Sequence, residues 1–245
     1  MVSKNQIKLI TGLQQKKYRK QHKLFFAEGI KVVQELLNSN FELHHLYTTQ
    51  DIFKGLPKDK VTVIDESDLK KISALTTPQA CLALFEMPEE KPVPATGLIV
   101  ALDDVRDPGN LGTIIRLCDW FGILHLVCSE NCVDVYNPKV VQATMGSISR
   151  VNIVYTDLQA YLAQSTVPVF GTFMDGENIY TKQMPQEGIV VLGNEANGIS
   201  LEIEALCTER IAIPRFGDLQ QTESLNVATA AAITLSELRR NFSGK

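Results

Sequence analysis

Three stretches of the chain combine glycine with polar side chains that could do chemistry, and each follows a short apolar run. They are Asp103–Arg116 (DDVRDPGNLGTIIR), Gly193–Ile199 (GNEANGI) and the segment after Ile211–Ile213, which ends in SLNVA. Strand ends and helix starts are the places where α/β proteins bind ligands. The three stretches are therefore the candidate site.

The first stretch places one arginine inside an otherwise apolar helix. Pro108 and Gly109 predict a turn, Asn110 can cap the helix, and Arg116 follows Ile114 and Ile115. Such an arginine can be a snorkelling surface group, or its planar fork can bind a phosphate. The glycine spacing is only a weak phosphate-loop signal, because the GxGxxG pattern is missing.

The second and third stretches are expected to form a tight loop and the start of a helix. Glycines around Glu195 suit a loop whose backbone passes close to a ligand such as an adenine edge, although an ordinary strand-to-helix turn fits as well. In the third, Ser224 is a plausible N-cap. The predicted buried face of the following helix consists of Leu225, Ala228, Ala232, Leu235 and Leu238, and Arg239 and Arg240 close it.

Composition limits the classes of protein that fit. The chain has 245 residues, 44% of them hydrophobic, which suffices for one or two domains. It contains no run of about 18 apolar residues, so no membrane span is expected, and MVSKNQIKLI lacks a signal-peptide core. Five scattered cysteines predict reduced thiols in a cytoplasmic protein. Cys128 and Cys132 have no second pair nearby, so we expect no metal site.

The charge is distributed unevenly. Residues 1–31 hold eight Lys or Arg against one acid, a net charge of +7, so a total of −4 leaves −11 on the remainder. Such asymmetry indicates an anionic partner, with nucleic acid as one candidate. A solvated basic helix face would give the same composition, and both interpretations stay open.

Periodicity predicts an α/β protein with two domains. A small α/β domain is expected over residues 1–86 and a Pro-rich linker over 87–97. A second domain over 98–245 is expected to hold a mostly parallel sheet with helices on both faces. In the first domain we expect helices at 3–17, 30–37, 49–53 and 67–75 and strands at 24–27, 44–48, 61–64 and 81–85. In the second we expect strands at 98–102, 124–128, 151–154, 167–172, 188–192 and 211–213 and helices at 110–121, from Asn137, at 157–164 and from Ser224.

Together the three stretches are far more specific than each alone. The order DPGNxGxxxR, LGNEAxG and IP followed by SLNVA resembles the three motifs of the SpoU (TrmH-type) RNA 2′-O-ribose methyltransferases of the SPOUT superfamily. The resemblance covers Leu98–Arg240 closely. It extends more loosely to KYRKQHKLFFAEGIKVVQELL, which looks like the family's substrate-binding domain.

The resemblance implies a C-terminal deep trefoil knot, S-adenosylmethionine held in a bent pose, and a homodimer packed around each active site. The substrate would be tRNA or rRNA. By similarity, the cofactor would be bound by Thr172, Gly193, Gly198, Ile213 and Leu225. No metal is needed, because the sulfonium already activates the methyl group.

The resemblance also assigns roles in transfer. Arg116 would act on the ribose hydroxyl, as a base or by coordinating the adjacent phosphate, from its own or the partner subunit. Arginine is an awkward base, because the guanidinium holds its proton very strongly. The supporting positions are Asn110, Glu195, Ser224 and Asn226. RNA phosphates would be bound by Lys16, Lys17, Arg19, Lys20 and Lys23.

Two departures from the family pattern stand out: Ala228 replaces the usual serine, and the loop from Gly217 to Ser224 is longer. A non-catalytic RNA-binding protein that keeps the fold is the alternative function. A nucleotide-dependent oxidoreductase is disfavoured, since GxGxxG is missing after the first strand of each domain.

Overall fold

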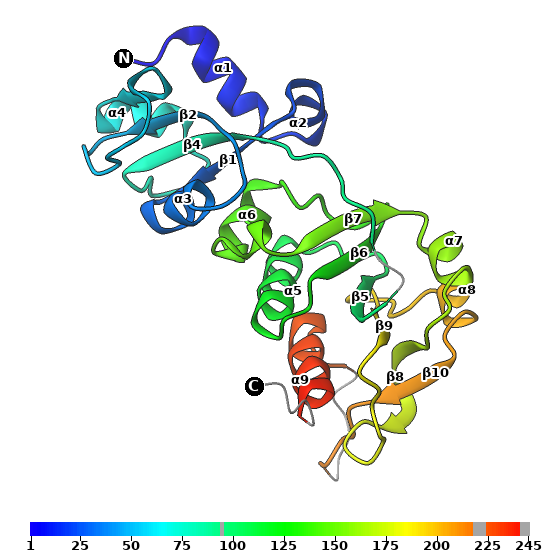
Figure 1. Ribbon diagram of the computed structural model, residues 1–245. Coiled ribbons are helices and arrows are strands. Elements are labelled where there is room, and N and C mark those ends of the chain that lie inside the picture. Colours follow the sequence, from blue (N-terminus) through cyan, green and yellow to red (C-terminus); the bar gives the residue numbers. More distant parts are fainter. Residues whose placement is uncertain (94–95, 218–223, 241–245) are drawn as a thin grey trace. The chain divides into compact units, whose positions relative to one another are not determined.

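The computed structural model describes residues 1–93, 96–217 and 224–240. The chain forms two compact units (Figure 1). The first combines Met1–Glu89 with Asp134–Ser149, and the second combines Glu90–Val133 with Arg150–Lys245. The segment 134–149, which sequence periodicity assigns to the second domain, therefore packs as part of the first unit.

The first unit is built on a mixed sheet in the order β1-β4-β2-β3, in which only β2 and β3 run parallel. Its strands are β1 (Leu24–Glu28), β2 (Leu43–Thr48), β3 (Val61–Val63) and β4 (Cys81–Glu86). Its helices are α1 (Lys4–Gly12), α2 (Lys16–His22), α3 (Ile30–Leu37), η1 (Lys58–Lys60), α4 (Glu66–Ile72), α6 (Pro138–Thr144) and η2 (Ser147–Ser149). Ile10, Phe26 and Leu84 lie in one core cluster, which joins α1 to the sheet.

Two helix predictions in this unit are wrong. The helix expected over 3–17 is split, because Gln15 adopts an extended conformation (φ −100°, ψ 132°) and α2 begins after it. The basic stretch Tyr18–Lys23 lies largely in α2. No helix forms near 49–53, where the Thr48 hydroxyl accepts a hydrogen bond from the Gln50 amide at 3.1 Å. Such local side-chain bonds compete with helix formation.

The predicted start of α6 is confirmed. Asn137 accepts a hydrogen bond from the Lys139 amide at 2.9 Å, and Pro138 occupies the first helical position. The segment packs on the first unit through the Tyr136 ring, whose centroid lies 4.7 Å from that of Phe25. Gly146 lies against α3, because a Cβ at this position would be only 2.5 Å from the Cβ of Glu35.

Arg19 joins α2 to this packed segment. It is 2% exposed, and its Nη1 donates to the carbonyls of Leu13 (2.8 Å) and Gln14 (2.9 Å). Its Nε donates to Asp134 Oδ2 at 3.0 Å, within a salt bridge to the same carboxylate. The guanidinium is thus enclosed by four acceptor contacts inside the first unit, and it is not presented to an external ligand.

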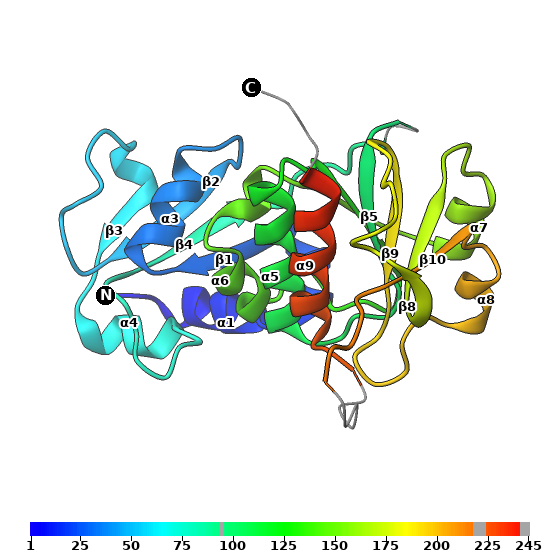
Figure 2. The same cartoon turned by 90° about the horizontal axis from the view of Figure 1, so that it is seen from below.

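The second unit contains a six-stranded, all-parallel sheet in the order β10-β8-β9-β5-β6-β7. The strands are β5 (Leu98–Leu102), β6 (His125–Ser129), β7 (Asn152–Thr156), β8 (Val169–Asn178), β9 (Gly188–Leu192) and β10 (Glu209–Ala212). The helices are α5 (Pro108–Trp120), α7 (Leu158–Ala163), α8 (Leu201–Glu204) and α9 (Val227–Arg239). Figure 2 shows α5 beside α9 on one face and α7 beside α8 on the other.

The strands at the centre of this sheet are buried on both faces, as their continuous apolar sequences predict. Every residue of β5 and β9 is buried. The expected α/β architecture with a parallel sheet and helices on both faces is confirmed. Two details differ: β8 continues to Asn178, and the short helix α8 was not predicted.

The C-terminal helix begins two residues later than predicted. Asn226, and not Ser224, is the N-cap, since its Oδ1 accepts from the amides of Ala228 (2.9 Å) and Thr229 (3.2 Å). The predicted buried face is correct only in part, because Leu225 is 47% exposed. The buried residues of α9 are Val227, Ala228, Ala231, Thr234, Leu235 and Leu238.

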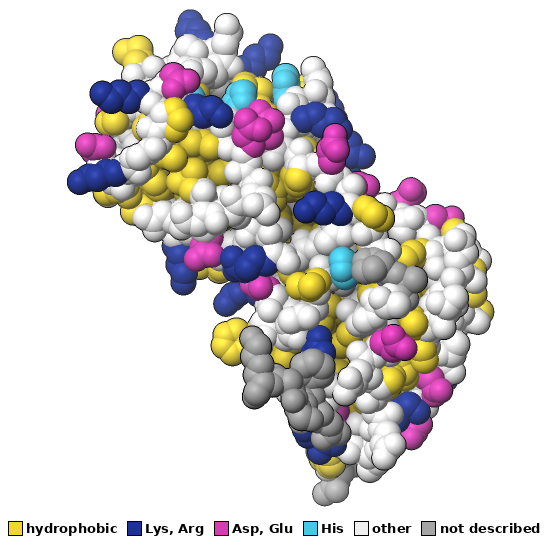
Figure 3. Space-filling model, viewed as in Figure 1, with side chains coloured by type: hydrophobic (Ala, Val, Ile, Leu, Met, Phe, Trp, Pro, Cys, Tyr) yellow, Lys and Arg dark blue, Asp and Glu magenta, His cyan; other side chains and the backbone are white. Residues whose placement is uncertain are grey.

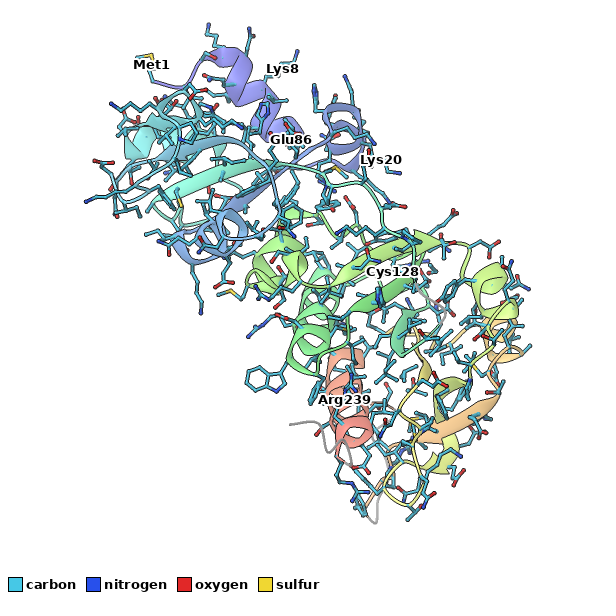
Figure 4. The ribbon with its side chains drawn as sticks, viewed as in Figure 1. Met1, Lys8, Lys20, Glu86, Cys128 and Arg239 are labelled. Atoms are coloured by element: carbon cyan, nitrogen blue, oxygen red, sulfur yellow. The ribbon has the colours of Figure 1, made fainter. Side chains whose placement is uncertain are left out.

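Arg239 closes α9, as predicted, and it also ties that helix to α5. Its Nε donates to the Phe121 carbonyl at 2.9 Å and its Nη2 to the Gly122 carbonyl at 3.2 Å (Figure 4). These carbonyls end α5, where a cation is favourable. Among the described residues, none of the helices has the length and apolar character needed to cross a bilayer.

Replacing Arg19 by Met should destabilise the first unit strongly. The apolar stem is kept, but Asp134 and two carbonyls lose their donor, and breaking a buried ion pair costs about 3–5 kcal/mol. Lys20→Met, at the exposed neighbouring position, is the matched control and should change stability by less than about 0.5 kcal/mol. Urea unfolding of both variants measures the difference; equal midpoints would contradict the structural role of Arg19.

Candidate functional site

The three polar stretches meet at one edge of the parallel sheet. They follow β5, β9 and β10, whose carboxyl ends share an edge because all six strands run parallel. The strand β9 lies directly between β5 and β8, and β8 pairs with β10. Segments about 90 residues apart in the chain, at Asp104 and Asn194, are thereby joined by a hydrogen bond of 2.7 Å from Asn194 Nδ2 to the Asp104 carbonyl.

One side chain from each stretch enters a continuous hydrogen-bonded chain. Asn110 Nδ2 donates to Glu195 Oε1 at 3.0 Å. Asn226 Nδ2 donates in turn to Asn110 Oδ1 at 2.9 Å, and Asn226 also caps α9. Of Arg116 and the four supporting positions, three residues are therefore brought together, and each comes from a different one of the three stretches.

Glu195 is the acceptor at one end of this chain. Besides Asn110, its carboxylate accepts from the backbone amides of Asp107 at 3.2 Å and Arg106 at 3.4 Å. Burial opposes ionisation of Glu195, but the hydrogen bonds from Asn110 and from backbone amides outweigh it, so its pKa lies below the ordinary value. The carboxylate is thus ionised at neutral pH and engaged in fixing the loop after β5.

Further polar groups that the sequence motifs did not indicate fix the same loops. Asp103 is buried, and its Oδ2 accepts from both the amide and the hydroxyl of Ser200, each at 2.7 Å. Asn194 Oδ1 accepts from the amides of Ala196 (2.9 Å) and Asn197 (3.0 Å). An acid directly after a buried strand was the available signal for Asp103.

The loop after β9 requires glycine at two positions. A Cβ on Gly193 would lie 2.2 Å from the backbone carbon of Gly198, far inside contact distance. Gly198 itself has φ +71°, a left-handed conformation that favours glycine. The tight loop predicted around Glu195 is therefore present, closed by paired hydrogen bonds between Asn194 and Gly198.

A cleft of about 1140 Å³ lies against these loops in the second unit. All of the predicted cofactor residues line it: Thr172, Gly193, Gly198, Ile213 and Leu225. Glu195 and Ser224 line it as well. Asn110 is hydrogen-bonded to Glu195, and Asn226 is hydrogen-bonded to Asn110. Part of the longer loop after Gly217 (residues 218–223) lies outside the described residues.

Arg116 is placed differently from the rest of the predicted set. It lies on the exposed side of α5, whose buried residues are Leu111, Gly112, Ile114, Ile115 and Cys118. It does not line the cleft and takes no part in the hydrogen bonds that join Asn110, Glu195 and Asn226. Trp120, one helical turn further along the same side, is 84% exposed.

The predicted RNA-binding residues fall into two groups. Lys16, Lys17, Lys20 and Lys23 are exposed, whereas Arg19 is buried in the contacts described above. Lys and Arg side chains lie around the α1 and α2 region in Figure 3, and Lys20 projects from α2 in Figure 4. The exposed lysines can contact a polyanion directly, and Arg19 supports the helix that carries them.

The five cysteines are free thiols, and four of them are buried. Cys132 accepts from the Val105 amide at 3.3 Å, so it helps hold the loop after β5. In the described part of the chain no group of three or more His, Cys, Asp or Glu is arranged to hold a metal ion.

Comparison with known proteins identifies the family. The model of the SpoU rRNA methylase family matches residues 97–236, and that of an MRM3-like substrate binding domain matches residues 4–83. The chain belongs to the SpoU rRNA methylase family. The resemblance seen in the three motifs is thereby confirmed.

Among similar proteins is the 23S rRNA (guanosine(2553)-2′-O)-methyltransferase of Bacillus subtilis, 32% identical over 97% of both chains. A solved structure from Porphyromonas gingivalis, assigned to the TrmH family of RNA methyltransferases, is 42% identical and has a TM-score of 0.89, covering 98% of this chain and 99% of that one. An AdoMet-bound rRNA methyltransferase from Sinorhizobium meliloti is 29% identical with a TM-score of 0.86, covering 100% and 98%.

The lowered pKa of Glu195 predicts a pH-dependent contribution to stability. A carboxylate with a depressed folded pKa stabilises the fold above its unfolded pKa, about 4.3, and this contribution is lost as the pH falls through the lower folded pKa. Glu195→Gln should therefore be less stable than the wild type at neutral pH, with the gap closing in acid.

Urea unfolding at stepwise lower pH measures that gap. Glu130→Gln, at an exposed position, should track the wild type throughout. A gap for Glu195→Gln that stays constant down to the lowest pH would show that ionisation of Glu195 contributes nothing.

Proposed function

We propose that this protein transfers the methyl group of S-adenosylmethionine to a ribose 2′-hydroxyl of ribosomal RNA. The observation that carries the proposal is the Asn110–Glu195–Asn226 chain, which joins the three family motifs beside a cleft lined by every expected cofactor residue. The names of the Bacillus subtilis and Sinorhizobium meliloti relatives support rRNA as the substrate and AdoMet as the cofactor.

The reaction needs positioning more than activation of the donor. The sulfonium already makes the methyl group electrophilic, whereas the ribose hydroxyl is a weak nucleophile that must be brought in line with it. As the oxygen–methyl bond forms, the sulfur–methyl bond would break to leave S-adenosylhomocysteine, and the hydroxyl proton would pass to bulk water. Glu195 is ionised but holds three hydrogen bonds, so it serves to fix the loops around the cofactor. Ser224 lies in the cleft wall next to that loop system and is an expected substrate contact.

Arg116 is proposed to bind the phosphate beside the target ribose. Its guanidinium is cationic, and its planar fork matches the geometry of a phosphate. Since Arg116 lies on the exposed side of α5 and outside the cleft wall, we propose that it serves the cleft of a partner subunit.

The same surface supports the proposal of a homodimer. The side of α5 that carries Arg116 also carries Trp120, 84% exposed, and Leu124 just beyond the helix is 61% exposed. Tryptophan is enriched at the centres of protein interfaces. A second copy packed on this face would cover Trp120 and bring its own Arg116 toward the first subunit.

The two domains are proposed to have separate binding roles. Residues 1–86 would bind RNA, with phosphates contacted by Lys16, Lys17, Lys20 and Lys23, and residues 98–245 would bind the cofactor in a trefoil knot. A cytoplasmic location stays a prediction from the thiols. Ala228, in place of the family's serine, is buried, and its amide is capped by Asn226, so the cap does not need the missing hydroxyl.

Methyl transfer from labelled cofactor to rRNA should be abolished or reduced by about 10²–10³-fold in Arg116→Ala, an effect typical of losing one charged transition-state contact. Calorimetric binding of S-adenosylmethionine should stay unchanged. Lys139→Ala, a cation in α6, serves as the control for a general loss of charge. Transfer at the wild-type rate in Arg116→Ala would overturn the assignment. Cofactor uptake without transfer in the wild type would favour the non-catalytic alternative.

Subunit mixing decides which subunit supplies Arg116. A variant with an intact cleft but Arg116→Ala is refolded together with a variant carrying Gly193→Val, whose side chain cannot fit beside Gly198. Each is inactive alone. If Arg116 acts across the interface, a random mixture should recover roughly a quarter of wild-type activity, because half the dimers are mixed and each has one complete site. No recovery would show that Arg116 serves its own subunit.

Trp120→Asp should convert the dimer to monomers, since it places a charge at the centre of an apolar interface. Light scattering after size exclusion measures the mass, and circular dichroism checks the fold. Lys31→Asp, at an exposed position of α3, controls for the charge change. A wild type that is monomeric at micromolar concentration would refute the dimer directly.

A further inference from the structure

One buried hydroxyl of α9 has no hydrogen-bond partner. Thr234 is 1% exposed, and among the buried side-chain nitrogen and oxygen atoms of the described residues its Oγ1 stands alone in this respect. A threonine inside a helix ordinarily donates to a carbonyl three or four residues earlier. A buried polar group left without a partner costs about 1–3 kcal/mol, so it calls for an explanation.

The position of Thr234 explains the missing partner, because the residue lines the cleft. It shares a stripe of α9 with Val227 and Ala230, spaced three and four residues apart, and all three are part of the cleft wall. Both companions are apolar, so the Thr234 side chain provides the polar group of that stripe. Its hydroxyl would meet a molecule that fills the cleft.

The surrounding wall indicates which part of a ligand would lie there. Ile179, Ile211 and Ile213 also line the cleft, and Ile233, the neighbour of Thr234, packs on the cluster that contains Ile179 and Ile211. A flat aromatic base suits such a wall, because its faces are apolar and its edge carries ring nitrogens and an amino group. The charged amino-acid end of the cofactor would instead need charged or polar partners, and the charged residues of the cleft wall are Glu195, Glu204 and Arg215, not this apolar part of it.

We propose that Thr234 Oγ1 hydrogen-bonds the edge of the cofactor's adenine ring and so contributes to recognition of the base. This inference rests on the proposed function, which places S-adenosylmethionine in the cleft. A hydroxyl can both donate and accept, so it can pair with either the ring nitrogens or the amino group of adenine. In the free protein the same group stays unpaired, and ligand binding removes that penalty.

Thr234→Val tests the proposal with almost no change in shape. Calorimetry should show affinity for S-adenosylmethionine reduced by about five- to tenfold, the effect of one buried hydrogen bond. Methylthioadenosine, which keeps the adenosine but lacks the amino-acid end, should lose affinity by the same factor. Thr234→Ser should retain wild-type binding of both ligands. Thr229→Val, on the exposed side of the same helix, is the matched control.

The outcomes separate the possible roles of the hydroxyl. Unchanged binding of both ligands by Thr234→Val would overturn the proposal. Weaker S-adenosylmethionine binding with unchanged methylthioadenosine binding would place the hydroxyl at the amino-acid end and overturn the adenine assignment. The unfolding temperature of the ligand-free variant should not fall, which distinguishes a binding role from a structural one. If the wild type bound neither ligand, the proposed function itself would fail, a result distinct from the others.

Discussion

The structure of the second unit depends on one constraint: three loops far apart in the chain must be held at one edge of a parallel sheet. The sheet brings them close, but loops carry unsatisfied backbone groups and would not keep a fixed conformation alone. Glu195 supplies the fixed point, because its carboxylate accepts two backbone amides of the loop after β5 and the amide side chain of Asn110. Asn226 extends the chain to the start of α9.

This arrangement explains why the motif residues are mostly short amides and acids. Asparagine can donate with one side-chain atom and accept with the other, so Asn110 and Asn226 each bond two partners at once. Asn194 repeats the pattern, since it donates to the Asp104 carbonyl and accepts from the Ala196 and Asn197 amides, whereas Asp103 accepts two hydrogen bonds from Ser200. The polar groups form a hydrogen-bonded network, and the backbone of Gly193 and Gly198 lines the cleft beside it. A side chain at Gly193 would have no room there.

The sequence predicted the second unit well because its signals are local. Continuous apolar runs mark strands buried on both faces, and the glycines and amides after them mark the ligand-binding edge. Helix boundaries were less predictable, since they depend on competition between nearby side chains. Asn226 and Ser224 are both good caps by type, and only the bonds from Ala228 and Thr229 decide between them.

Contacts between residues far apart in the chain could not be predicted from the sequence pattern. Arg19 sits in a run of cations that resembles a solvated basic face, yet it is buried because Asp134, 115 residues later, is its partner. Sequence periodicity could not assign the segment 134–149 to the first unit. Periodicity predicts where the helix forms, but it does not indicate which unit the helix packs against. The sequence likewise gives no sign that the Thr234 hydroxyl lacks a hydrogen-bond partner, because Thr234 is one of several small residues in an alanine-rich helix.

The division between cleft residues and Arg116 has a physical consequence for the site as a whole. The cofactor-side residues are rigidly tied to one another within a single subunit, whereas Arg116 has no such tie to them and shares an exposed helix face with Trp120. A group that binds substrate phosphate must be accessible until RNA arrives, so it has to be exposed. Loops that shape a cofactor cleft must keep a fixed conformation, and burial of their polar contacts helps to hold it. The proposed dimer would meet both needs if packing Trp120 against a second copy fixed the helix that carries Arg116 and left the guanidinium open to the RNA.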